Sequence, residues 1–332
     1  MSSITTSAPA TSALAGLKRL ADADKSLWLP ISVVIALSAF FAVSTDSFAT
    51  VRNLTAVSGQ AGTLLIVCLG ATFVVLLGSI DLSIGAIVLL VGAASVVLLN
   101  ATGIGFAILI FAAALGAILG AVNGLIYVFG RIPSFVVTLG TLSVFTGIAL
   151  QILDGRAIEY NDFALEAISI GQIVPHLPNI ALWSLLAWAA VVAVASRTRF
   201  GRYMYIIGGG EAVARTSGVP VKRHKVYAFA LSGLLAGVGS ILAVARLGAA
   251  GPSLGSDLLL NSLAAIVVGG TSLAGGTGGP HRTLLGVLII AILDNGLNLM
   301  GVSQYTQMVV KGAVVVAAVL ISQERLKAVI IK

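Results

Sequence analysis

The sequence contains few charged residues, which make up 9% of its 332 residues, whereas apolar residues make up 58%. A soluble globular protein has about 25% charged residues. The 19 basic and 12 acidic side chains are too few to cover a water-exposed surface of this size. The composition therefore excludes a soluble globular enzyme and indicates a membrane protein.

Groups that commonly carry catalysis or bind metal ions are also scarce. The single cysteine, Cys68, cannot form an intrachain disulfide or a cysteine metal cluster, and the three histidines lie far apart in the sequence. The phosphate-binding pattern GxxxxGK(S/T) does not occur, so the chain is not expected to hydrolyse ATP by that route. We therefore expect no catalytic residues, no cofactor and no metal site.

Long apolar runs fill most of the chain. A helix needs about 20 apolar residues to cross a membrane, and one of the runs, 258–270, is short for this task. The sequence predicts an all-α polytopic membrane protein with about ten transmembrane helices, at residues 27–43, 57–77, 83–99, 104–129, 134–151, 180–196, 226–246, 258–270, 283–299 and 305–321.

The basic residues show on which side each connection lies. With a cytoplasmic N-terminus, ten crossings place fifteen basic residues inside, in the segments 1–26, 131, 197–225, 271–282 and 322–332. The opposite side has three, namely Arg52, Arg156 and Arg246. This asymmetry follows the positive-inside rule and places both termini in the cytoplasm. It also accounts for the net charge of +7, so no nucleic-acid partner is expected.

The predicted organisation is therefore a cytoplasmic tail (1–26), a transmembrane domain (27–321) that contains a cytoplasmic loop (197–225), and a second cytoplasmic tail (322–332). Several of the apolar runs are rich in small residues, as in 116–120 and 232–237. Small residues let helices approach closely in lipid, where packing replaces the hydrophobic driving force. A tight helical bundle is expected.

Residues 78–85, with the sequence GSIDLSIG, interrupt a long apolar stretch. A carboxylate at membrane depth is a candidate functional group, and here it belongs to Asp81. The alternative is that Asp81 or Ser83 caps the helix that follows.

Residues 269–276, with the sequence GGTSLAGG, resemble the first motif at both glycine ends. Paired glycine-interrupted segments in two halves of a chain indicate a transport pathway. The alternative is a close helix crossing that requires glycine.

Two loops are long enough to contact partners. The outer loop, 152–179, carries four acidic residues against one arginine, and the inner loop, 197–225, carries seven basic residues against one acid, Glu211. Within the inner loop, glycines bracket a short segment, 211–217, whose acid at the start and base near the end favour a helix. Composition leaves open whether this segment docks on a partner or is an ordinary solvated connector.

Five segments, taken together and in their order, resemble the membrane permease subunits of bacterial ribose-type ABC importers for monosaccharides. These segments are 78–85, 132–141, 208–219, 264–273 and 295–298. The resemblance implies a multi-pass subunit of the bacterial inner membrane that lies in lipid and forms a sugar path. It also implies three partners: a cytoplasmic ABC ATPase, an extracytoplasmic sugar-binding protein and a second permease copy or paralogue.

The same resemblance implies that the inner loop is the coupling loop on which the ATPase acts, with the residues Arg199, Arg202, Glu211, Ala212, Arg215, Ser217 and Gly218. The chain departs from the family pattern at Ser79, at 258–263 and at 279–282, which leaves the substrate open. A path for a neutral sugar needs hydroxyl and amide groups, so the candidate lining residues are Ser79, Asp81, Ser83, Asn123, Thr138, Thr141, Thr271, Ser272, Asn295 and Asn298.

An alternative function is an autonomous secondary transporter or channel for a small polar solute. This function needs a coupling carboxylate within the membrane, and Asp81 and Asp294 are the candidates. Lys311, within the last apolar run, either extends its amine to an interface or pairs across helices with Asp294. An intramembrane enzyme is disfavoured, because no histidine lies in an apolar run.

Overall fold

The computed structural model describes residues 10–160 and 162–330. Residues 1–9 of the expected N-terminal tail and residues 331–332 of the C-terminal tail lie outside the described residues. The helices are α1 (Ala10–Ser44), α2 (Val51–Leu76), α3 (Ile84–Thr102), η1 (Gly105–Ala107), α4 (Ile108–Gly130), α5 (Ser134–Leu153), α6 (Phe163–Ser169), α7 (Asn179–Arg197), α8 (Arg199–Gly209), α9 (Glu211–Thr216), α10 (Val221–Leu247), α11 (Leu258–Val268), α12 (Pro280–Leu299) and α13 (Gln304–Ile330).

Each predicted apolar run coincides with a helix, so the all-α polytopic architecture is confirmed. Eight helices are long and apolar enough to cross a membrane, and two shorter apolar helices, at Leu258–Val268 and Gln304–Leu320, correspond to the other two predicted runs. Helix α1 begins at Ala10, well before the predicted first apolar residue. Within the described residues, the one sheet pairs two-residue strands antiparallel, β1 (Ile158–Glu159) with β2 (Ala249–Ala250).

Helix α11 explains why the run at 258–270 is short. It has 11 residues, which at about 1.5 Å per residue span roughly half of the hydrocarbon core. The chain continues as a loop, 269–279, whose Gly276 N–H donates to the carbonyl oxygen of Leu76 at the end of α2 (2.9 Å). The half-length helix and the loop together bring the chain to the end of α2, where α12 begins.

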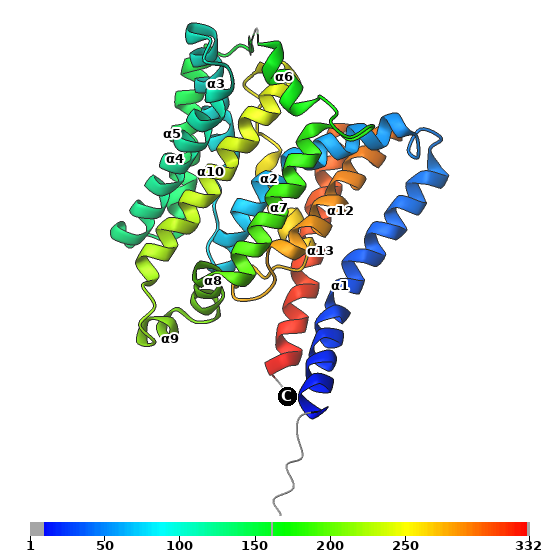
Figure 1. Cartoon of the computed structure of the whole chain (residues 1–332), viewed down its shortest axis with the longest axis vertical. Helices are drawn as coiled ribbons and strands as arrows, with labels where there is room; N and C mark the ends of the chain where they lie inside the picture. Colours follow the sequence, from blue (N-terminus) through cyan, green and yellow to red (C-terminus); the bar gives the residue numbers. More distant parts are fainter. Residues whose placement is uncertain (1–9, 161, 331–332) are drawn as a thin grey trace, which may run out of the picture.

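Figure 1 shows the two ends of the bundle. Helices α8 and α9 lie at the same end as the beginning of α1 and the end of α13, and α6 lies at the opposite end. The arrangement therefore groups the segments that carry most of the basic residues. This grouping agrees with the charge asymmetry of the sequence.

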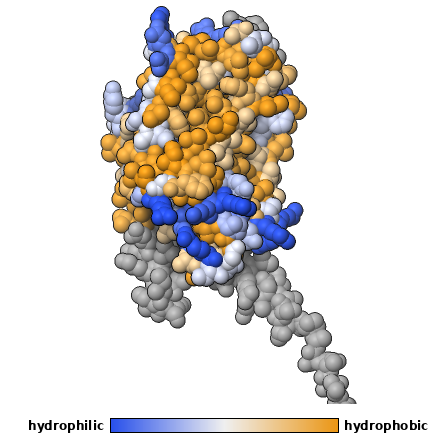
Figure 2. Space-filling model, turned by 90° about the vertical axis from the view of Figure 1, so that its left-hand side faces the viewer, coloured by the Kyte–Doolittle hydropathy of each residue, from blue (hydrophilic) through white to orange (hydrophobic). Residues whose placement is uncertain are grey.

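Helix α2 lies at the centre of the bundle and contacts α7, α10, α11 and α12. In the most apolar 18-residue stretch of α2, 94% of the residues are buried. The corresponding share is 22% for the span that contains α4 and 28% for α5. The exposed side chains of α4 and α5 are largely apolar, among them Ile110, Phe129 and Leu139. Figure 2 shows a broad apolar flank with hydrophilic side chains gathered near its lower end, as expected for a surface that faces lipid or another subunit.

Helices α4 and α10 approach one another at glycines. A Cβ atom on Gly116 would overlap the carbonyl oxygen of Gly233, and a Cβ atom on Gly120 would overlap that of Phe229. Gly237 faces the backbone of Ala112 in the same way. The small-residue clusters predicted to pack closely thus pack against each other, which brings the two backbones into direct contact.

We expect Gly120→Val to lower the unfolding temperature of the purified protein, because the added side chain must separate α4 from α10. Overpacking of this kind costs about 1–3 kcal/mol. Thermal unfolding in detergent, followed by the loss of monodisperse protein, measures the effect. Gly147→Val is the matched control, since nothing lies within 4 Å of a Cβ atom at this position of α5. Equal unfolding temperatures for the two variants would contradict the role of the glycine contact.

Candidate functional site

The predicted coupling loop folds into two short helices, α8 and α9, that project from the bundle (Figure 1). Thr198 begins α8, where its Oγ1 accepts a hydrogen bond from the Gly201 N–H (3.2 Å) and so satisfies one of the free donors at the helix start. Met204 and Ile207 are buried, whereas Arg199 and Arg202 are exposed. Helix α8 is therefore anchored by apolar side chains and presents basic residues outward.

Helix α9 is held in place by its first residue. Glu211 Oε1 pairs with Arg215 Nη2 (2.6 Å) one turn along the helix, and Glu211 Oε2 pairs with Lys225 Nζ (2.6 Å) on α10. Burial tends to raise the pKa of Glu211, but Lys225 and Arg215 outweigh this effect and hold the pKa below its usual value. The carboxylate thus stays ionised and joins α9 to the base of α10.

The remaining predicted coupling residues lie on the outside of this projection. Ala212, Arg215, Ser217 and Gly218 are all exposed. Val213 beside them is 67% exposed, whereas Ala214 is fully buried. Helix α9 therefore has a buried anchor on one side and a small, partly apolar surface with a basic residue on the other.

A chain of polar contacts leads from α9 to the break between α2 and α3. Lys225 Nζ lies 4.7 Å from the centre of the Tyr127 ring on α4, a cation–π contact. The Ser79 hydroxyl donates to Tyr127 Oη (3.3 Å). Ser79 belongs to the first glycine motif, so the position of α9 is linked through three side chains to this motif.

Asp81 is buried and fully engaged by its neighbours. Its Oδ1 accepts hydrogen bonds from the Ser83 backbone N–H (3.0 Å) and from the Ser83 hydroxyl (2.7 Å). The Ser232 hydroxyl on α10 donates to Oδ2 (3.4 Å), and Asn123 Nδ2 on α4 donates to Ser83 Oγ (2.7 Å). The carboxylate therefore closes a turn before α3, while Ser83 makes no side-chain cap bond.

Hydroxyl groups of helix α5 accept hydrogen bonds from further backbone N–H groups of this break. The backbone N–H groups of Ile80 and Leu82 donate to Ser134 Oγ (3.2 Å) and Thr138 Oγ1 (3.0 Å), respectively. Thr141, one turn further, is half-buried and donates to the Thr138 carbonyl oxygen (3.4 Å). These hydroxyls replace the helical bonds that the irregular backbone lacks, which is required wherever water is excluded.

The two glycine motifs meet in space. A Cβ atom on Gly78, whose φ is +70°, would lie 3.0 Å from the Ala274 carbonyl oxygen. In the second motif Thr271 Oγ1 accepts from the Gly279 N–H (3.0 Å), and Ser272 Oγ accepts from the Ala274 N–H (3.2 Å). Tyr205 of α8 donates to the Gly278 carbonyl oxygen (3.0 Å). The motifs that resemble each other in sequence thus form one junction beside α8.

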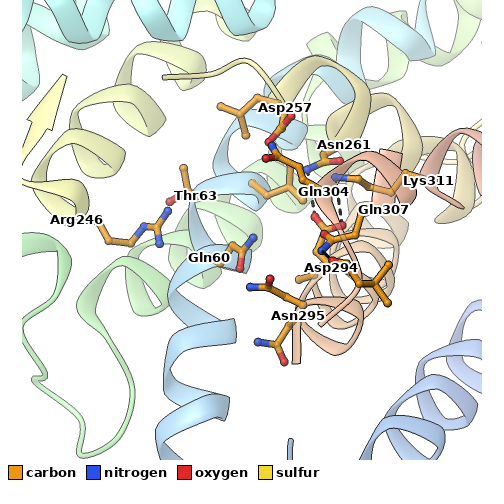
Figure 3. A pocket seen from close by; sticks show the side chains of 15 residues that line it. Gln60, Thr63, Arg246, Asp257, Asn261, Asp294, Asn295, Gln304, Gln307 and Lys311 are labelled. Carbon is orange, nitrogen blue, oxygen red and sulfur yellow. Dashed lines mark hydrogen bonds and ion pairs between the residues drawn. The ribbon is translucent and has the colours of Figure 1, made fainter. Parts of the chain in front are cut away.

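A polar cavity of about 340 Å³ lies toward the other ends of these helices. Figure 3 shows its side chains converging from several helices, with Arg246 and Lys311 on opposite sides. Of the predicted path residues, Asn295 and Asn298 line it. The other lining residues are Gln60, Thr63, Leu64, Arg246, Asp257, Leu258, Asn261, Ala291, Asp294, Val302, Gln304, Gln307 and Lys311.

An ion pair crosses one wall of the cavity. Lys311 Nζ on α13 lies 3.3 Å from Asp294 Oδ1 on α12, with side chains that are 7% and 11% exposed. Asn261 Nδ2 on α11 donates to Asp294 Oδ2 (3.3 Å). Of the two alternatives for Lys311, the structure has the pair across helices. Asn295 forms reciprocal hydrogen bonds with Asn53 of α2 (both 2.9 Å).

The predicted path residues thus fall into three groups. Ser79, Asp81, Ser83, Asn123, Thr138 and Thr141 hold the first break, Thr271 and Ser272 shape the second, and Asn295 and Asn298 reach the cavity. Sequence reasoning did not select the other polar residues of the cavity, among them Gln60, Thr63 and Asn261. The available signal was weak, because each is a single polar residue within or beside an apolar run.

The family model described as "Branched-chain amino acid transport system / permease component" matches residues 53–319. The ribose import permease of Escherichia coli K12 is 36% identical over 88% of this chain and 92% of its own length. The ribose import permease of Bacillus subtilis 168 is 38% identical over 78% and 81%. The xylose transport system permease of E. coli K12 is 30% identical over 94% of both chains. No solved structure matches the chain.

These matches cover nearly all of the transmembrane region, including both glycine motifs and the projecting helices. They confirm the sequence-based identification of an ABC importer permease subunit and of a multi-pass protein of the bacterial inner membrane. The chain therefore belongs to the family of branched-chain amino acid transport system permease components.

Proposed function

We propose that this chain forms the translocation path for a neutral monosaccharide or similar polyol, as the permease subunit of an ABC importer. The observation that carries the proposal is α9, an exposed helix joined to α10 by Glu211 and through Tyr127 to the first glycine motif. The relatives named above, and a D-allose transport system permease of E. coli that is 33% identical, are named for pentoses and a hexose. These sugars are neutral and rich in hydroxyl groups.

In this proposal the chain supplies no chemistry of its own. A cytoplasmic ABC ATPase hydrolyses ATP and docks on α9 and the basic face of α8. An extracytoplasmic binding protein delivers the sugar, and the acidic outer loop at 152–166 helps to seat it by charge complementarity. A second permease copy or a paralogue completes the path, and the apolar flank not covered by that partner faces lipid.

Transport follows from the rigid connections of α9. Movement of the ATPase displaces α9, and the Glu211–Lys225 pair transmits the displacement to α10. Because Lys225 also contacts Tyr127, the displacement reaches Ser79 and the junction of the two glycine motifs. The bundle halves then rock between outward-facing and inward-facing states. The candidate path residues at the junction act by holding the backbone that moves, and Asn295 and Asn298 act on the path itself.

Two observations count against an autonomous secondary transporter. Such a transporter needs a membrane carboxylate that is free to gain and lose an ion. Asp81 accepts hydrogen bonds from Ser83 and Ser232, and Asp294 is paired with Lys311. Both candidate coupling carboxylates of a secondary transporter are therefore engaged in contacts within the protein.

We expect Glu211→Ala to reduce sugar-stimulated ATP hydrolysis by about fivefold to hundredfold, the range of a coupling free energy of 1–3 kcal/mol. The physical reason is that α9 loses both of its ion pairs, including the one to α10. ATP hydrolysis and uptake are measured in proteoliposomes that contain the permease, its ATPase and the loaded binding protein. Asp46→Ala, an exposed acid at the opposite end of the bundle, is the control and is expected to couple normally. Normal coupling in the Glu211 variant would remove the argument for α9.

We further expect the purified chain alone to catalyse no uptake of D-ribose, D-xylose or D-allose into proteoliposomes. Uptake should begin only after addition of the ATPase, ATP and the binding protein, because the force is applied through α9 from outside the chain. Radiolabelled sugar measures both conditions. Accumulation by the chain alone in a proton, sodium or sugar gradient would instead support the secondary transporter.

A further inference from the structure

We propose that the polar cavity between α2, α10, α11, α12 and α13 is a binding site within the permease for one neutral, hydroxyl-bearing solute of monosaccharide size. The proposal rests on the proposed function and adds a place where the solute is held during transfer. The cavity lies toward the end of the bundle opposite α9, where α2 begins and α10 and α12 end. This is the end at which a solute delivered from outside would enter.

Unpaired buried polar atoms are concentrated around this cavity. Among the described residues, six buried side-chain polar atoms have no hydrogen-bond partner, but one of them, Asp294 Oδ1, is ion-paired with Lys311. Three of the other five, on Thr63, Arg246 and Asn261, belong to residues that line this cavity. Two of these residues, Thr63 and Asn261, are at least nine-tenths buried. A buried polar group without a partner has lost its hydrogen bonds to water and forms none in exchange, which costs free energy. Their concentration around one cavity indicates a guest that forms hydrogen bonds.

The cavity presents a mixed set of hydrogen-bond donors and acceptors. The Thr63 hydroxyl donates and accepts, the Asn261 amide oxygen accepts, and Arg246 Nε donates. The side-chain amides of Gln60 and Gln307 add further groups of both kinds. A sugar hydroxyl also donates and accepts, so a polyol can satisfy such a mixed set, whereas a purely apolar solute cannot.

The charged side chains around the cavity favour a neutral solute. The lining contains two cationic side chains, Arg246 and Lys311, and two anionic ones, Asp257 and Asp294. Their formal charges cancel, and Asp294 and Lys311 form an ion pair with each other. A cationic or anionic solute would therefore gain no net attraction, which favours a neutral guest. Asp294 acts as a positioning residue, because it accepts a hydrogen bond from Asn261 at the cavity wall and is itself paired with Lys311.

The size and the apolar lining agree with transient binding. A volume of about 340 Å³ lies within the range of about 300–1,000 Å³ for small-molecule sites. The apolar residues of the lining are Leu64, Leu258, Ala291 and Val302, and no aromatic ring is among the lining residues of the described chain. A site without a ring on which a sugar can stack relies on hydrogen bonds and releases its ligand readily, as a transfer site must.

The decisive variant is Thr63→Val, which replaces an unpaired buried hydroxyl by a methyl group of similar shape. If the hydroxyl contacts only water or nothing, this variant is neutral for binding and does not lower the unfolding temperature. If the hydroxyl contacts solute, the dissociation constant rises by about twofold to tenfold, the loss of one neutral hydrogen bond. Ser95→Ala is the matched control, because the Ser95 hydroxyl is also buried and unpaired but does not line the cavity.

Binding is measured on the purified full-length permease in lipid nanodiscs, with D-ribose, D-xylose and D-allose as probes in saturation-transfer NMR titrations. We expect at least one probe to bind, more weakly in Thr63→Val and unchanged in Ser95→Ala. Absence of binding for all three probes, or equal binding by the two variants, would contradict the proposed binding site and indicate that the cavity holds only water.

Uptake by the complete importer separates this inference from the proposed function. If the wild-type importer transports a probe sugar and Thr63→Val transports it with an unchanged KM, the site is wrong and the proposed function stands. If the wild-type importer transports none of the three sugars, the proposed substrate class is wrong.

Discussion

The requirement that buried backbone groups find hydrogen-bond partners within the protein governs this structure. Lipid offers no donors or acceptors, so irregular backbone is tolerated in a membrane only where the protein itself replaces the missing bonds. At the break between α2 and α3, the hydroxyls of Ser134 and Thr138 accept hydrogen bonds from backbone N–H groups that have no helical partner. Asp81 closes the turn by accepting a hydrogen bond from the Ser83 N–H. The polar residues that interrupt the apolar runs are thus first of all backbone partners.

Close contact between helices is the second condition, because helices in lipid gain little from the hydrophobic effect. The glycines of α4 and α10 bring the two backbones together at Gly116 and Gly233. The junction of the two glycine motifs uses the same device, since Gly78 and Gly276 both have a positive φ and lie against neighbouring backbone. Such contacts leave little space between the backbones of neighbouring helices.

Two helices connect the ends of the molecule. Helix α2 lines the polar cavity near its start, with Gln60 and Thr63, and ends at the first glycine motif beside α8. Helix α10 holds Glu211 through Lys225 near its start and reaches the cavity with Arg246 near its end. A displacement of α9 therefore acts on elements that also line the cavity. This continuity gives the proposed coupling a physical route from one end of the bundle to the other.

The sequence by itself determined the class of fold and the apolar runs and predicted the sidedness, because hydropathy and the placement of basic residues depend only on local composition and on the membrane as solvent. Its glycine brackets and single acid predicted a short helix at 211–217, which the structure has as α9, whereas the proposed coupling role of this segment came from the family resemblance. Only the tertiary structure decided which polar residues meet. Gln60, Arg246 and Lys311 lie in different helices far apart along the chain, and no local pattern places them around one cavity. The Asp294–Lys311 pair depends likewise on how α12 and α13 pack, a geometry that sequence spacing does not contain.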